Sequence, residues 1–173
     1  MVITYSALAL RPVCLALIVG DTEMARILAR TDFPLVAETP YNPLIVPADA
    51  SYPPVLPLAA REKAKATIEQ KTRLYLRDGF KDVYTGELLV YHPTLLLLSL
   101  LLPTELPYDA SWRLGIGHSM YYSLSPTYDH VISLAVGGRD VEENWASCSQ
   151  TTNSLKDVRS LAVLRWHRHG SVS

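Results

Sequence analysis

A chain of 173 residues, 49% of them hydrophobic, is long enough to bury one ordinary core and too short for two comfortable domains. The formal net charge of −1 excludes the overall excess of Lys and Arg on which non-specific nucleic-acid binding usually draws, so any polyanion must be gripped locally. The only cysteines, Cys14 and Cys148, cannot form a disulfide framework or a cysteine-rich zinc site from this chain alone, and a reducing cytoplasm fits best.

The N-terminal residues 2–19 are apolar and predict a buried strand or a short buried helix. No basic residue precedes Arg11, and there is no convincing small-residue cleavage site, so a signal peptide is not expected. A helical pattern then begins at Asp21 and runs through Leu28.

A proline-rich arm and a basic helix are expected next. Seven prolines between residues 34 and 57 predict an extended linker or wrapping arm without regular structure. Residues 58–78 contain no Gly or Pro and predict a helix that Gly79 ends. Basic side chains outnumber acidic ones on this helix and again near the C-terminus: Arg61, Lys63, Lys65, Lys71, Arg73 and Arg77, then Lys156, Arg159, Arg165 and Arg168. Either run alone is more often a solvated helix face than a binding site.

A leucine run at residues 94–102 is the next distinctive feature. It is broken by Ser99 and bounded by Pro93 and Pro103, and it is much shorter than the roughly 20 apolar residues of a membrane span. We therefore expect core, or a contact surface for a protein partner or a second copy. His118, further along, is expected to be a partly buried or surface histidine.

The residues with the clearest chemistry follow. Asp129 and His130 stand at the head of an apolar strand, and a Gly137-Gly138 turn comes next. Asn144 lies fifteen positions after Asp129, and Asn153 lies nine positions further. The acid can be a metal ligand, the imidazole a base, and the amide a second metal ligand. A site that cleaves phosphodiester bonds needs these three groups.

This arrangement resembles the HNH nuclease motif, the ββα-metal fold shared by colicin nucleases, many restriction and homing endonucleases, phage resolvases and the second nuclease domain of Cas9-type effectors. It is most similar to the Asp-His … Asn … Asn version. The resemblance implies an α+β fold with a ββα-metal core in an HNH domain at residues 80–170. This domain would carry an insertion at about 92–124 and follow an N-terminal helical and proline-rich extension at residues 1–79.

The resemblance also implies roles for the motif residues. His130 is the expected general base, usually oriented in the family by a backbone carbonyl, and Asp129 and Asn153 are the expected ligands of one Mg²⁺ or Mn²⁺. Asn144 is expected to act mainly through structure, by hydrogen-bonding across the loop. Residues 83–86 look like a zinc knuckle that keeps its turn glycine without the thiolates, so no structural zinc is expected.

Three basic residues are the candidate phosphate contacts. Lys156 lies three positions after Asn153, on the same face of the expected helix, where it could steady phosphate charge. Arg139 and Arg159 are weaker candidates for contacts to the DNA backbone.

The sequence thus predicts a cytoplasmic, metal-dependent HNH endonuclease that hydrolyses DNA, with no membrane association. The resemblance implies 5′-phosphate and 3′-hydroxyl ends. One rival is a module that binds nucleic acid but scarcely cuts it. The other is an interaction protein that docks through its leucine-rich segment, with the nuclease fold as a scaffold.

Overall fold

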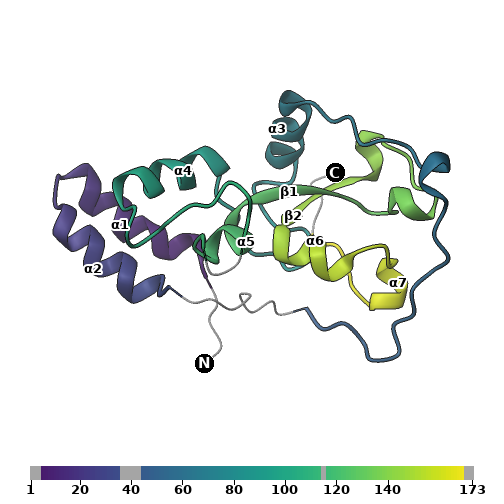
Figure 1. Ribbon diagram of the computed structural model, residues 1–173, viewed down its shortest axis with the longest axis horizontal. Coiled ribbons are helices and arrows are strands. Elements are labelled where there is room, and N and C mark those ends of the chain that lie inside the picture. Colours follow the sequence, from purple (N-terminus) through teal and green to yellow (C-terminus); the bar gives the residue numbers. More distant parts are fainter. Residues whose placement is uncertain (1–4, 36–43, 114–115, 170–173) are drawn as a thin grey trace. The chain divides into compact units, whose positions relative to one another are not determined.

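The chain forms two compact units, each built from two separate stretches of sequence (Figure 1). The computed structural model describes residues 5–35, 44–113 and 116–169. Unit 1 comprises residues 1–41 and 88–125, and unit 2 comprises residues 42–87 and 126–173. The expected division at residue 79, with a single core, is therefore not the division that the structure shows. A hydrophobic pattern in the sequence indicates which residues are buried. It does not indicate which distant segment of the chain packs against them.

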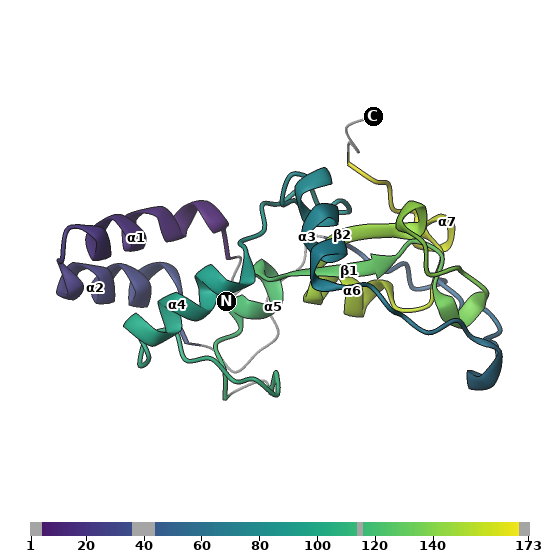
Figure 2. The same ribbon diagram turned by 90° about the horizontal axis from the view of Figure 1, so that it is seen from above.

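Unit 1 begins with a pair of helices, α1 (Leu10–Ile18) and α2 (Thr22–Asp32), which run side by side in both views (Figures 1 and 2). A short 3-10 turn, Ala7–Ala9, leads into α1, so the helical alternative for this apolar segment is the one that forms. Asp21 caps α2 by accepting a hydrogen bond from the backbone N–H of Met24 at 2.9 Å. Residues 2–4 of the expected element lie outside the described residues.

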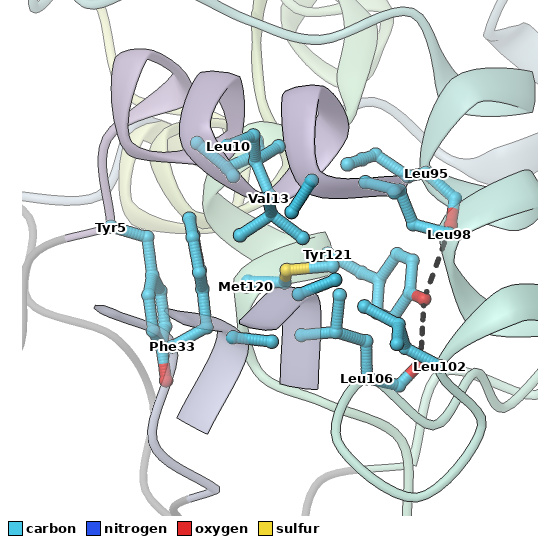
Figure 3. Close-up of a cluster of buried hydrophobic side chains, with 14 residues drawn as sticks. Tyr5, Leu10, Val13, Phe33, Leu95, Leu98, Leu102, Leu106, Met120 and Tyr121 are labelled. Atoms are coloured by element: carbon cyan, nitrogen blue, oxygen red, sulfur yellow. Dashed lines mark hydrogen bonds between the residues drawn. The ribbon is translucent and has the colours of Figure 1, made fainter. Parts of the chain in front are cut away.

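The helices α4 (His92–Leu101) and α5 (Met120–Leu124) complete the core of unit 1 (Figure 3). Leu95, Leu98 and Leu102 are buried, so one side of the leucine run is core, as the sequence predicts. The hydroxyl of Tyr121 donates to the carbonyls of Leu106 at 3.0 Å and Leu95 at 3.4 Å. None of the helices in the described ranges has the length and apolar character needed to cross a membrane.

Unit 2 contains a two-stranded antiparallel sheet and the helix that follows it. Strand β1 (Pro126–His130) pairs with β2 (Trp145–Ser149), with His130 opposite Trp145. Helix α6 (Gln150–Lys156) starts directly after β2, where the Ser149 hydroxyl accepts from the N–H of Thr152 at 3.1 Å. A short helix, α7 (Leu161–Leu164), comes next. Helices and an antiparallel sheet in one chain agree with the expected α+β class.

Helix α3 (Ile68–Arg77) is shorter than the helix expected over residues 58–78. Thr67 and Gln70 form a capping box that fixes its start, while only a 3-10 turn at Leu58–Ala60 precedes it. Gly79 follows the helix with a φ of +66°, as a C-terminal glycine should. Residues 44–57 contain no helix or strand, as expected for the arm, and residues 36–43 lie outside the described part.

Two carboxylates, those of Asp78 and Asp82, bond the segment between α3 and residue 86 to strand β2. Asp82 accepts from the N–H groups of Tyr84 at 3.0 Å and Thr85 at 3.3 Å, and its second oxygen accepts from Ser149 N–H at 2.9 Å. Asp78 accepts from Ser147 N–H at 2.8 Å. Two small apolar clusters pack beside these bonds, one around Tyr84 and the other around Trp145.

Candidate functional site

An open cavity of about 750 Å³ in unit 2 brings the predicted site residues together. Asp129 and His130 line it from the end of β1, and Asn153 lines it from α6. The segment from Leu58 to Ala64 contributes another part of its wall. Three residues that the sequence spacing singled out therefore line one cavity.

Asp129 and His130 are successive residues of β1, so their side chains point to opposite faces of the sheet. The His130 ring lies 5.3 Å from the Tyr128 ring, whereas the Asp129 carboxylate contacts Tyr84 and Lys156. The N–H of Val131, the residue after β1, donates to the carbonyl of Asn144 at 2.8 Å and turns the chain into the loop.

Asn144 holds the loop between the strands closed. Its side-chain oxygen accepts from Ile132 N–H at 2.9 Å, and its amide donates to the carbonyls of Ile132 at 2.9 Å and Arg139 at 2.8 Å. Gly138 packs against the same loop so closely that a Cβ atom there would lie 1.8 Å from the Ile132 oxygen. Only glycine fits at that position. Asn144 thus makes the cross-loop hydrogen bonds that the sequence analysis expects of it.

Asp129 is almost fully buried between a phenol and an ammonium group. Tyr84 donates its hydroxyl hydrogen to Oδ2 at 2.6 Å, while Lys156 Nζ lies 3.1 Å from Oδ1 and 3.0 Å from Oδ2. Burial raises the pKa of the Asp129 carboxyl, and the Lys156 charge and the Tyr84 hydroxyl only partly oppose it. Burial and the Asp129 charge raise the pKa of Tyr84, so this phenol stays a hydrogen-bond donor.

The three basic residues predicted to contact phosphate differ in burial and in their partners. Lys156 is fully buried and also donates to the His130 carbonyl at 2.8 Å, so it ties α6 to β1 and does not reach the surface. Arg159 donates to the Leu155 carbonyl at 3.0 Å and lies over the Tyr52 ring. Arg139 has a side chain that is 75% exposed. Of these three, Arg139 is the one placed to meet a polyanion.

His130 has a partner that sequence reasoning missed. Its Nε2 atom lies 2.8 Å from Oδ1 of Asp140, a carboxylate in the loop between the strands. The backbone carbonyl expected to orient the imidazole is therefore replaced by a charged side chain. No local pattern marks Asp140, because it is one polar residue in a polar loop, and only the fold brings it to the imidazole.

The arm that precedes α3 is bonded to this loop. Glu62 accepts from the N–H of Asp140 at 2.6 Å, and Leu56 N–H donates to the carbonyl of Ala135 at 2.7 Å. Two basic residues of the arm, Arg61 and Lys63, line the cavity beside the motif residues. The sequence places both on a helix, whereas the structure puts them in extended chain at the cavity wall.

The donors at the cavity fit a divalent cation that keeps most of its ligands as water or phosphate oxygens. Asp129 and Asn153 offer oxygen atoms, the type that Mg²⁺ and Mn²⁺ prefer, and a carboxylate oxygen can accept more than one bond. Within the described ranges, no three His, Cys, Asp or Glu residues gather as a metal cluster. A cation would therefore share Asp129 with the Lys156 ammonium, which predicts weak binding.

Comparisons with protein-family models, with curated proteins and with solved structures find no match to this chain.

Proposed function

We propose that the chain is a metal-dependent endonuclease of the HNH type that hydrolyses DNA phosphodiester bonds. The observation that carries this proposal is that Asp129, His130 and Asn153 line one open cavity. The order of elements around it, strand, loop, strand and helix, supports the ββα-metal interpretation. The Asn144 bonds support it too, because they hold the loop in the way the motif requires.

In this proposal His130 accepts a proton from a water molecule in the cavity as the water oxygen attacks phosphorus. The new P–O bond forms in line with the bond to the 3′ oxygen, which breaks and leaves a 5′-phosphate. The departing 3′ oxygen takes a proton from solvent. Asp129 and Asn153 would hold the cation, which when bound would draw electron density from the phosphate.

The cavity lining carries both signs of charge, with Arg61 and Lys63 beside Glu62, Asp129 and Asp157. Arg139 extends from the neighbouring loop, and its Nε lies 3.9 Å from Glu62 Oε1. The proposal therefore relies on a bound cation, together with these basic side chains, to attract a phosphate group. We expect binding to weaken steeply as salt rises, because phosphate contacts release counterions.

Nicking of supercoiled plasmid with Mg²⁺ or Mn²⁺ tests the proposal. We expect the wild type to nick, His130→Ala to lose activity, and His167→Ala to behave as wild type because His167 is an exposed histidine outside the cavity. Equal nicking by wild type and His130→Ala would remove His130 from its role. A gel shift in EDTA that finds salt-sensitive binding without cutting would favour the binding-module alternative.

A second candidate is an interaction role for unit 1. Leu97, Leu100 and Leu101 on α4 are 55%, 77% and 46% exposed, which is unusual for neighbouring leucines. Docking of a partner or a second copy through residues 94–102 would cover them. Size-exclusion chromatography of Leu97→Gln/Leu100→Gln beside wild type tests this, and identical elution of two monomeric species would count against self-association.

A further inference from the structure

We propose that Asp140 is a positioning residue for His130: its carboxylate holds the imidazole in the tautomer with hydrogen on Nε2 and leaves Nδ1 to accept the proton from water. The catalytic part of this inference rests on the proposed nuclease function. The part about the imidazole does not, because it concerns only which ring nitrogen carries hydrogen.

The hydrogen bond between the two side chains fixes the tautomer. An ionised carboxylate can only accept, so the 2.8 Å contact requires a hydrogen on Nε2. In the neutral ring the other nitrogen then carries a lone pair. No residue in the described part of the chain hydrogen-bonds Nδ1. The His130 and Asp140 side chains are only 12% and 6% exposed, so water competes little for their contact.

Asp140 is itself held from three directions. Trp145 Nε1–H donates to the same oxygen as His130 at 3.0 Å, and the backbone N–H of Lys65 donates to the other oxygen at 2.6 Å. Burial acts to raise the pKa of the Asp140 carboxyl, but the hydrogen bonds from His130, Lys65 and Trp145 outweigh it and hold the pKa below its ordinary value. The carboxylate is therefore ionised at neutral pH and cannot rotate freely.

An amide at position 140 cannot reproduce this arrangement. If the oxygen of Asn faced His130 and Trp145, its NH₂ group would face the Lys65 N–H. Both groups are hydrogen-bond donors, so they could not bond to each other. If the amide were reversed, its NH₂ would meet the Trp145 indole N–H and would require Nε2 to accept. The reversed orientation selects the other tautomer, in which Nδ1 carries hydrogen and so cannot accept the proton from water.

The test measures plasmid nicking and the His130 tautomer in Asp140→Asn. We expect kcat to fall on the order of 10²–10⁴-fold, the typical contribution of a positioned general base, with a smaller change in KM. Long-range ¹H–¹⁵N spectra at neutral pH should show hydrogen on Nε2 in the wild type and a shift toward Nδ1 in the variant. Asp157→Asn is the matched control, since Asp157 lines the same cavity and is exposed.

Each outcome decides a different claim. Unchanged kcat in Asp140→Asn would overturn the inference, whichever tautomer the spectra show. A wild type that never nicks DNA would remove the proposed function, while the spectra would still show whether Asp140 sets the tautomer. A loss of activity shared equally by Asp157→Asn would also count against Asp140, because it would trace the loss to charge in the cavity.

Discussion

The two units bury different kinds of side chain. The core of unit 1 is mostly apolar (Figure 3). One charged side chain is buried in the described part of this unit, Glu105, whose Oε1 lies 2.6 Å from Arg30 Nη2. Unit 2 has smaller apolar clusters and buries four charged side chains next to them: Asp78, Asp82, Asp129 and Lys156. Burial of charge is costly unless each group is paired.

This contrast indicates what each unit contributes. Unit 1 has the composition of a region stabilised by removing apolar surface from water. Unit 2 buries charged side chains beside an open cavity, which is more typical of a functional site than of a structural scaffold. We therefore expect substitutions in unit 1 to change stability, and substitutions around the cavity to change activity, except where they break a buried ion pair.

The largest expected effect is on activity. Asn153→Ala should lower metal-dependent nicking on the order of 10²-fold or more with little change in unfolding temperature, because it removes an expected ligand at a partly exposed position. Ser154→Ala, a truncation of a neighbouring cavity residue, is the control. Full activity of Asn153→Ala would contradict the assignment of this residue as a ligand.

The next effect should be on the stability of unit 2. Lys156→Met leaves the buried Asp129 carboxylate with no opposite charge, so we expect a loss of about 3–5 kcal/mol. Hydrogen exchange followed peptide by peptide should locate the loss in unit 2. Lys81→Met changes an exposed lysine and should leave exchange as in the wild type. If both variants were equally stable, the Lys156–Asp129 pair would have no structural role.

A matched pair of leucines on α4 tests the apolar core of unit 1. Leu98 is 3% exposed and Leu100 is 77% exposed. We expect Leu98→Ala to cost about 2–5 kcal/mol through lost burial and a cavity, and Leu100→Ala to change stability by less than about 0.5 kcal/mol. Chemical denaturation measures both, and similar losses for the two variants would mean that Leu100 is covered.

The smallest effect concerns pH and His118. This histidine is fully buried, its Nε2 lies 2.9 Å from the Phe33 carbonyl, and its Nδ1 accepts from Met120 N–H at 3.1 Å, so it must be neutral. Burial lowers the pKa of His118 in the folded chain, and the unfolded chain therefore binds the proton first. The free energy of unfolding should therefore show no loss from His118 above a pH of about 6.5. Below that pH it should fall by up to about 1.4 kcal/mol per pH unit.

Thermal unfolding between pH 7 and 5 measures this dependence. His118→Gln cannot titrate in this range, so it should remove the part of the pH dependence that belongs to His118. The part that belongs to His92, whose pKa burial also lowers, should remain. An unchanged slope in that variant would show that other groups set the pH response.

Local signals in the sequence predicted local features well. The Asp21 cap, the Gly79 stop and the loop bonds of Asn144 all depend on residues close in the chain. The capping-box pattern at Thr67 and Gln70 also marks the start of α3, and it is a more specific signal than the absence of Gly and Pro over residues 58–78. Helix-compatible composition does not make a helix without tertiary contacts.

Features that depend on distant contacts were not readable. The pairing of the N-terminal helices with residues 88–125 follows from packing between segments far apart. Lys156 was expected to contact phosphate, whereas it is buried against Asp129, a partner that is distant in sequence. The bond from Asp140 to His130 needs a closed loop, which no residue pattern specifies.

Plasmid nicking by the wild type and by His130→Ala, with Mg²⁺ or Mn²⁺ and with His167→Ala as control, tests the central claim most directly. We predict metal-dependent nicking that is lost in His130→Ala and kept in His167→Ala. Nicking that survives in His130→Ala at the wild-type rate would contradict the account.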